Sequence, residues 1–477
     1  MLAPNRCIGH NDIIGQCMKL ALSKGVGVMR GMLVALLVLG WVPVILFKPH
    51  VGVLVWNWVS HMAPHSYTYN FARDFPFLVA IFFVTAIGMV LNKDKKSLPA
   101  HPLIFGVIIY WLWLVFTTLV SMDNTGLGLS TTKLIHISKV LIFVLISIAV
   151  MQSPNRLKGF VWVMSLSLGY IGVKGGLFTI ITGGGARVEG AGGMMGDNNQ
   201  LAMAMAMFTP MAIYLVQHPP LKIMKWPLIG AAILVPLSAV GTQSRGGFVA
   251  LAAVIFMLIL KTKHKFKTLF AVALLGWAAI AFMPDSWKNR MQTTESAATE
   301  DGSFRGRVSM WKFSVNLVDD YPVEGGGFNV FYVPRAKELY MPPGFIARAP
   351  HSIYFEVLAE HGYVGLILFL TLIFTGWFSA GTQAKLLRRY QETKWLGDLC
   401  AALQLSLIGY AVGGLTVNIA TFDVFYHVLA IIVMCHVVGE QLLAGTLTLV
   451  GSNRKLAANK AADKWSPGVA AAPQENR

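Results

Sequence analysis

Charged side chains are scarce in this sequence of 477 residues, because Asp, Glu, Lys and Arg together make up only 13% of it. A soluble domain usually carries about 25%. Hydrophobic residues reach 55%, and the mean hydropathy is +0.60. This composition excludes an ordinary soluble domain. It predicts an all-α, polytopic membrane protein whose core is largely the interior of the bilayer.

Acidic residues are few: 22, against 39 Lys and Arg, which gives a net charge of +17. Such an excess can indicate nucleic-acid binding. The basic residues, however, lie mainly in short loops between apolar runs, and no basic stripe with interleaved aromatic residues occurs. We therefore expect no nucleic acid among the partners and interpret the charge as a determinant of membrane topology.

Cysteine is also rare. Cys7 and Cys17 precede the first apolar run, and Cys400 and Cys435 lie in apolar segments. None falls in the longest polar segment, so we expect no structural disulfide. No CxxC pair or His/Cys cluster indicates a metal, and no nucleotide-binding motif is present. The sequence therefore predicts neither a metal site nor a cofactor.

Apolar runs are what the sequence has in abundance. A spanning helix needs about 20 mostly apolar residues. We count twelve candidate spans, at 26–47, 75–92, 102–121, 134–152, 157–182, 199–217, 223–242, 246–261, 267–283, 362–382, 398–418 and 424–445. A further run at 51–60 is too short to span. Its tryptophans, Trp56 and Trp58, favour the headgroup level, so we predict an interfacial segment there.

The basic residues are concentrated in alternate loops. One set of loops holds Lys93, Lys95 and Lys96; Arg156 and Lys158; Lys222 and Lys225; Lys261, Lys263, Lys265 and Lys267; and Lys385, Arg388, Arg389 and Lys394. The positive-inside rule makes this set cytoplasmic. We predict a cytoplasmic segment at 1–25 without a cleaved signal peptide, nine spans within 26–283, an outward-facing loop at 284–361, three spans within 362–445, and a disordered cytoplasmic tail at 446–477.

The outward loop has a pattern of its own. Trp311, Val315 and Val318 recur at helical spacing, which predicts an amphipathic surface helix at 304–319. Asp319-Asp320-Tyr321-Pro322 should end it, because proline disfavours a helical residue before it. Gly325-Gly326-Gly327 indicates a flexible turn. Ala349-Pro350-His351 should break the chain and begin a helix that continues into the tenth span.

Two residues lead the candidates for chemistry. His351 suits a general base, since histidine exchanges a proton near neutral pH; a hydrogen-bonding role at a helix end is the alternative. Arg245, in Gln243-Ser244-Arg245-Gly246-Gly247, suits a phosphate group, which a guanidinium grips with two hydrogen bonds. Its alternative is an arginine that snorkels to the interface. The adjacent glycines favour close backbone approach.

Further cations extend the candidate anion site. Arg187 follows Gly183-Gly184-Gly185, which forms either a ligand-wrapping loop or a plain connector. Arg305 and Arg307 open the predicted loop helix, where anions are favoured; a solvated basic end is the alternative. Arg348 precedes His351. Two lysines lie inside predicted spans, Lys139 and Lys174, and Lys174 is the stronger candidate because it adjoins Gly175-Gly176. Glu356, Glu360 and His361 are candidates to support His351, although Glu356 should lie on another helix face.

With these residues in place, the chain resembles the O-antigen ligase family of bacterial inner membranes, which is related to O-antigen polymerases and protein O-oligosaccharyltransferases. The family pattern is His, then Asn, Ser or Gln, nine residues, Gly, two residues and Gly. Here it reads His351-Ser352, 353–361, Gly362, Tyr363-Val364 and Gly365. Ser244-Arg245-Gly246 looks like the family's arginine at an outer span end. The resemblance covers roughly 75–445 and implies a GT-C-like glycosyltransferase with a periplasmic loop.

The resemblance implies transfer of a glycan from undecaprenyl pyrophosphate to a sugar hydroxyl of the lipid A core, with inversion and without a metal. His351 would deprotonate or orient that hydroxyl. Arg245, with Arg305 or Arg307, would bind the pyrophosphate, and Arg187 and Arg348 compete for the second position. An O-antigen polymerase or a protein-glycosylating enzyme shares this chemistry. A flippase for lipid-linked sugars is the alternative of another class, although the sequence has no clear internal repeat.

Overall fold

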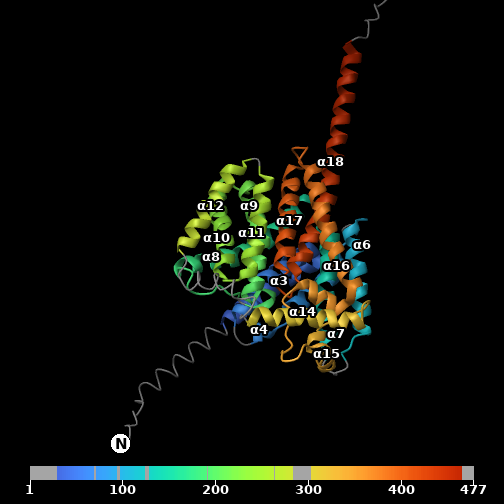
Figure 1. Ribbon diagram of the computed structural model, residues 1–477. Helices are drawn as coiled ribbons and strands as arrows, with labels where there is room; N and C mark the ends of the chain where they lie inside the picture. Colours follow the sequence, from blue (N-terminus) through green and yellow to red (C-terminus); the bar gives the residue numbers. More distant parts are fainter. Residues whose placement is uncertain are drawn as a thin grey trace, which may run out of the picture.

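The computed structural model describes residues 29–68, 71–93, 97–123, 128–190, 192–262, 264–282 and 302–464. Within these ranges every regular element is a helix (Figure 1). The expected all-α class is therefore confirmed. Expectations that concern 1–25, Cys7, Cys17, Lys95, Lys96, Lys263, the loop from 284 to 301 and the tail from 465 fall outside the described residues.

Nine helices of the described chain are long and apolar enough to cross a membrane. They are Met29–Phe47, which ends in α2 (Val42–Phe47), then α6 (Pro102–Leu119), α7 (Leu129–Val150), α8 (Pro154–Ile181), α9 (Asn198–Gln217), Lys222–Gly241, which includes α10 (Lys225–Gly241), α16 (Ile353–Leu387), α17 (Lys394–Gly413), and Asp423–Gly445 of α18 (Asp423–Lys464).

The remaining three predicted spans are also helical: α5 (Phe77–Leu91), α11 (Arg245–Lys261) and α12 (Lys265–Phe282). The first two have 15 and 17 residues. At 1.5 Å per residue they reach about 22 and 26 Å, less than the roughly 30 Å of hydrocarbon. The twelve predicted runs thus all form helices, and nine of these, among the described residues, meet the length and composition of a span.

Helix α9 lies at the centre and packs against α10, α11 and α17. Its Ala and Met residues are nearly all buried. Small residues let the neighbouring backbones approach closely, which is how helices associate without a hydrophobic driving force. A Cβ at Gly247 of α11 would overlap Ala202, and one at Gly413 of α17 would lie 2.6 Å from Met203 Cγ.

The short run at 51–60 lies inside the bundle, so its prediction as an interfacial segment was wrong. It forms α3 (Pro49–Met62), which packs against α5, α7 and α8. Trp56 is only 2% exposed and stacks on Phe143 with ring centroids 4.3 Å apart. The prediction depended on the run being too short to span the bilayer. A helix covered by other helices need not match the bilayer thickness, so that length criterion does not apply here.

The loops predicted to be cytoplasmic meet at one end of the bundle. Asp398 of α17 binds Arg388 at 2.7 Å, Lys394 at 2.8 Å and His218, which follows α9, at 3.0 Å. Lys158 near the start of α8 lies over the Trp395 ring, 4.7 Å from its centroid. The basic loops are therefore neighbours in space. The side of the membrane that this end faces stays a prediction.

The opposite end carries α14 (Gly302–Asp320) and α15 (Pro334–Tyr340), which lie across the bundle (Figure 1). The amphipathic helix and its end before Pro322 are confirmed. Of the residues that indicated this helix, Val318 is buried and Val315 is 41% exposed, and the adjacent Phe313 and Leu317 are fully buried. The apolar neighbours of Phe313 and Leu317 include Leu358 and Ala359 of α16.

At the basic end, α18 extends well beyond the other helices (Figure 1). The helix continues to Lys464, whereas we predicted disorder from 446 onward. The segment from 446 to 464 is rich in Ala, Lys and Leu, which are strong helix formers, and this composition explains the difference.

Candidate active site

The chain turns sharply just before α16, as the Ala349-Pro350-His351 sequence predicted. His351 has φ of 49°, a left-handed conformation that non-glycine residues seldom adopt. Trp311 of α14 donates from Nε1 to the Pro350 carbonyl at 3.0 Å. The Ile353 backbone N–H, at the start of α16, donates to Gly414 O at 2.8 Å. The turn at His351 is thus held between α14 and the α17–α18 loop.

The half-buried His351 side chain lies in a mixed electrostatic environment. Burial lowers its pKa below the ordinary 6.5, and Arg307 of α14 lowers the pKa further. Asp197 raises the pKa of His351, and Arg348 lowers it. The balance favours a neutral imidazole near pH 7, which is the form that accepts a proton.

Arg245 is the first residue of α11, whose helix cap is Ser244. The Gly247 N–H donates to Ser244 Oγ at 3.1 Å, and that hydroxyl donates to Asn199 Oδ1 at 2.7 Å. The glycines after Arg245 do bring backbones close together, as predicted. A Cβ at Gly246 would overlap Thr416 of the α17–α18 loop.

The start of α9 connects the two principal candidates. Asp197 caps α9 and accepts from the Asn199 N–H at 2.8 Å, and the Asn199 side chain in turn binds Ser244, the neighbour of Arg245. Asp197 also acts electrostatically on His351. His351 and Arg245 therefore both adjoin the start of α9, although they come from segments far apart in sequence.

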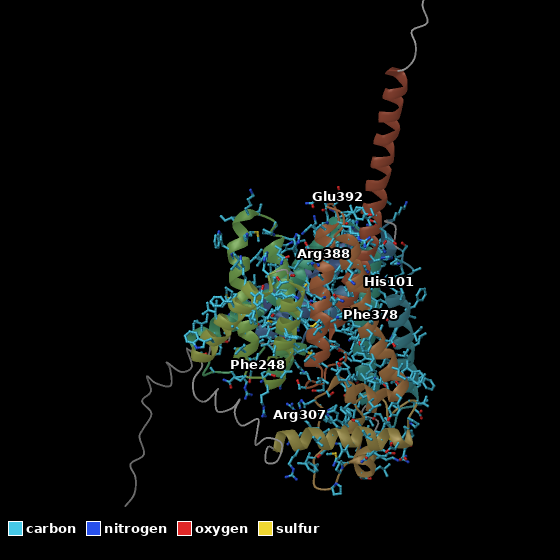
Figure 2. The ribbon with its side chains drawn as sticks, turned by 45° about the horizontal axis from the view of Figure 1, so that its top comes forward. His101, Phe248, Arg307, Phe378, Arg388 and Glu392 are labelled. Carbon is cyan, nitrogen blue, oxygen red and sulfur yellow. The ribbon has the colours of Figure 1, made fainter. Side chains whose placement is uncertain are left out.

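The other predicted arginines differ in their exposure and in their partners. Arg307 is half-buried and interacts with His351, whereas Arg305 and Arg348 are exposed. Figure 2 shows Arg307 at the end of the molecule opposite to Arg388 and Glu392. Arg187 lies 3.9 Å from Glu189.

Lys174 of α8 makes a cation–π contact. Its Nζ lies over the Tyr67 ring of the short helix η1 (Pro64–Tyr67), 4.8 Å from the centroid. The glycine-rich loop around Arg187 packs on the end of α10, since the Val188 N–H donates to Gly241 O at 3.0 Å. It is a docked connector in this structure.

Gly362 and Gly365, the two glycines of the pattern that begins at His351, have distinct structural roles. Gly362 interrupts α16, with φ of 66° and ψ of −172°, a conformation that is essentially confined to glycine. A Cβ there would overlap the Val323 carbonyl oxygen. The Tyr363 N–H donates to Pro322 O at 2.8 Å, which fastens the loop to the interruption. At Gly365 a Cβ would overlap the His361 Cβ and lie 3.2 Å from Trp113 Nε1.

Gly325-Gly326-Gly327 packs against the same interruption and is not the flexible turn that we predicted. The Gly326 N–H donates to Ala359 O at 2.8 Å, and the Gly327 N–H donates to Glu360 O at 2.9 Å. A Cβ at Gly325 would lie 2.6 Å from Gly362 N. Here the glycines provide close approach of two backbones, and their hydrogen bonds remove the freedom that glycine has in isolation.

Glu356 and Glu360 do not support His351. Both bind the Lys133 ammonium of α7, at 2.8 and 2.7 Å, within the bundle. Glu356 also accepts from the Ala420 N–H at 3.0 Å, and Glu360 from the Asn329 N–H at 2.9 Å. The doubt about Glu356 was justified, because it lies on a different face of α16.

His361 is likewise engaged elsewhere. Its Nδ1 lies 2.7 Å from Thr117 Oγ1, and Trp113 donates to its carbonyl at 3.0 Å. Both partners belong to α6. His361 therefore secures α16 against α6 and has no part in the surroundings of His351.

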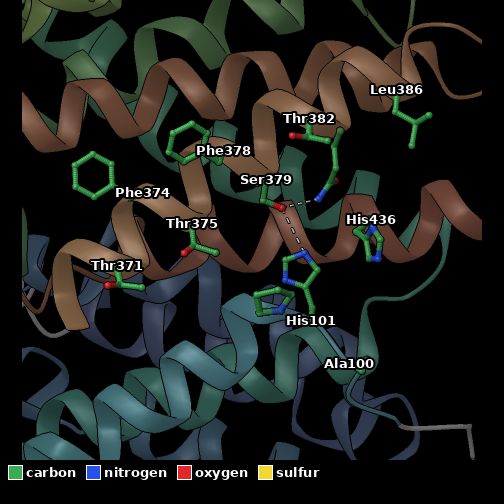
Figure 3. A pocket seen from close by; sticks show the side chains of 12 residues that line it. Ala100, His101, Thr371, Phe374, Thr375, Phe378, Ser379, Thr382, Leu386 and His436 are labelled. Carbon is green, nitrogen blue, oxygen red and sulfur yellow. Dashed lines mark hydrogen bonds between the residues drawn. The ribbon is translucent and has the colours of Figure 1, made fainter. Parts of the chain in front are cut away.

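A groove of about 630 Å³ lies along the far half of α16 (Figure 3). His101 Nε2 lies 3.4 Å from Ser379 Oγ there, and the His101 and His436 rings are 5.2 Å apart. Burial, followed by His436, lowers the pKa of His101 to about 4, so it is neutral at pH 7. The lining is otherwise mostly Thr, Phe and Leu.

These features define a polytopic helical membrane protein with a neutral histidine and several arginines at one end of the bundle. Residues 230–370, which include Arg245, His351, Gly362 and Gly365, match the family model described as O-Antigen ligase. This match supports the resemblance to the O-antigen ligase family, whose members are glycosyltransferase-like ligases and polymerases. Residues 28–222 match a family of unknown function (DUF5935). A search among curated proteins found no match.

Sequence reasoning missed two groups that the structure assigns to this end. Asp197 was not among the predicted site residues, although Asp-Asn-Asn before an apolar run is a helix-start signal. Lys133 was not among them either. The useful signal was the pair Glu356 and Glu360, four residues apart on a largely apolar helix, which requires a buried cation.

Proposed function

We propose that this protein is an O-antigen ligase that transfers a glycan from undecaprenyl pyrophosphate to a sugar hydroxyl of the lipid A core. The observation that carries the proposal has two parts: Arg307 and Asp197, the cap of α9, both act electrostatically on His351, and Ser244, the neighbour of Arg245, binds Asn199 at the same helix start. A base and phosphate-binding guanidinium groups are what transfer from a lipid pyrophosphate needs.

The reaction would be a single displacement. The acceptor oxygen attacks the anomeric carbon while the bond from that carbon to the pyrophosphate oxygen breaks, and the configuration inverts. His351 accepts the hydroxyl proton, and the lipid pyrophosphate leaves with the electron pair. Arg245 and Arg307 stabilise its charge. We prefer Arg307 to Arg305 because Arg307 is less exposed and interacts with His351.

The reaction would take place on the periplasmic face of the bacterial inner membrane. The support is the charge distribution, since the predicted cytoplasmic loops meet around Asp398. His351 precedes α16 and Arg388 follows it, so the two lie at opposite ends of that helix. Both termini would then be cytoplasmic.

The test uses purified full-length protein, the lipid-linked glycan donor and lipid A core. His351→Ala should reduce transfer by about 10²–10⁴-fold, the usual contribution of a general base. Arg245→Ala should cost on the order of 10²–10³-fold, as for other groups that stabilise developing charge. His264→Ala and Arg389→Ala are matched controls, because both side chains are exposed and lie away from this end.

Replacing the acceptor distinguishes the related activities. Glycan elongation on the lipid carrier without lipid A core would indicate a polymerase, and transfer to an acceptor protein would indicate protein glycosylation. Movement of the donor across vesicles with no product would indicate a flippase. Full transfer by a folded His351→Ala variant would refute the base assignment.

A further inference from the structure

Three polar side chains are buried together where α3 ends and α18 begins. His61, Asp423 and His427 are 0%, 4% and 0% exposed. One ring nitrogen or carboxylate oxygen from each lies within 4.8 Å of the others. Ser60, the neighbour of His61, is 363 positions from Asp423 in the chain, so sequence spacing does not indicate this group.

Three of the four imidazole nitrogens of this group lack hydrogen bonds. His61 Nε2 and both ring nitrogens of His427 have no partner among the described residues. The other nitrogen of His61, Nδ1, donates to Asn57 Oδ1 at 2.5 Å. That bond leaves an unshared electron pair on Nε2. Metal-binding histidines usually have such a partner on the far nitrogen, which fixes the tautomer and the ring orientation.

The carboxylate is oriented from two sides. Ser60 Oγ donates to Asp423 Oδ2, and the Val424 N–H donates to Oδ1 at 2.9 Å. Asp423 also lines a cavity of about 140 Å³, together with Ser60, His136 and Lys139. The group therefore has open space on one side. Trp56 and Phe160 pack on His427 with ring centroids 5.6 Å away, so aromatic rings cover that histidine.

We propose that His61, Asp423 and His427 bind a divalent transition-metal ion, for which Zn²⁺ is the best fit. The ligands would be His61 Nε2, one ring nitrogen of His427 and a carboxylate oxygen of Asp423. In tetrahedral Zn²⁺ sites ligand atoms lie roughly 3.3–3.5 Å apart, so binding requires a contraction on the order of 1 Å. Water from the cavity completes the coordination, as at three-ligand zinc sites.

The ion would secure the end of the bundle and take no part in glycosyl transfer. It would join α3 to the first turn of α18, directly after the α17–α18 loop. That loop contacts α16 through Gly414 and Ala420. The site is independent of the proposed function, because none of its three residues was assigned to the reaction.

The experiment uses purified full-length protein in detergent, treated with a chelator and then titrated with Zn²⁺ alone. We expect about one tightly bound Zn²⁺ per chain by elemental analysis and a rise in the apparent melting temperature. Asp423→Asn should lose that equivalent and the rise, while its amide oxygen can still accept from Ser60. Asn57→Ala should weaken binding by about 10–100-fold, the usual effect of losing the partner of a ligand histidine.

His65→Gln is the matched control, because His65 lines the same cavity but lies outside the three-residue group. It should keep both the stoichiometry and the melting shift. Two results would each overturn the proposal: no saturable Zn²⁺ binding by the original sequence, or equal binding and stabilisation in Asp423→Asn. If His427→Gln fails to fold, the Asp423→Asn comparison still decides the question.

Discussion

Replacing Gly362 with alanine should destabilise the protein more than any other Gly→Ala change in its membrane helices. The backbone there has φ of 66° and ψ of −172°. An L-residue in this region costs about 1–3 kcal/mol. The added Cβ would also overlap Val323 O and lie 2.8 Å from Pro322 O, so the loop must move away from α16.

That movement puts three hydrogen bonds at risk. They link Tyr363 to Pro322, Gly326 to Ala359 and Gly327 to Glu360. At about 0.5–1.5 kcal/mol each, their loss adds roughly 1.5–4.5 kcal/mol. With the backbone strain, the expected loss of stability is about 2.5–7.5 kcal/mol. The loop leads back to α14 and hence to Arg307, so transfer activity should fall as well.

The assay is the apparent melting temperature in detergent, measured beside glycan transfer. Gly230→Ala in α10 is the control, because a Cβ there meets nothing within 4 Å. Alanine at 230 should be neutral or stabilise by up to about 1 kcal/mol through helix propensity. If Gly362→Ala melts and reacts like Gly230→Ala, the interruption of α16 is not required and the reasoning fails.

Three further predictions concern contacts near this end. The acid limb of kcat/KM should lie below pH 6.5, because the pKa of His351 is lowered and only its neutral form accepts a proton. Arg307→Gln should move the limb to higher pH and Asp197→Asn to lower pH, and shifts in one common direction would contradict this environment. Lys133→Met should cost about 3–5 kcal/mol by isolating two buried carboxylates; the apparent melting temperature should recover when both are changed to glutamine. Ser244→Ala should lower stability by about 1 kcal/mol through loss of a helix cap, and an unchanged melting temperature would show that the cap is dispensable.

Features that depend on local sequence were predictable. The apolar runs became helices, the proline before His351 marked the start of α16, and Pro322 marked the end of α14. Features that depend on contacts between distant segments were not. The 51–60 run has the composition of an interfacial segment, and only the helices that cover it make it part of the core.

The candidate site divides in the same way. His351, Arg245 and Arg307 could be selected as candidates from residue type and neighbouring sequence, because these local features indicate their chemistry. Asp197 acts electrostatically on His351 across more than 150 positions of sequence, and nothing local indicates that interaction. Gly325 to Gly327 are read alone as a flexible turn, and the backbone that packs on them comes from α16.

The Lys133 ion cluster has a consequence for how the protein is made. Lys133 is 223 positions before Glu356, and Glu356 in turn needs the Ala420 N–H, 64 positions later. During synthesis from the N-terminus, the lysine enters the membrane long before its carboxylate partners exist. The end of the bundle around His351 can therefore reach its final arrangement only after the chain beyond α17 has been inserted. A chain that stops before this point would leave Glu356 without one of its hydrogen-bond donors.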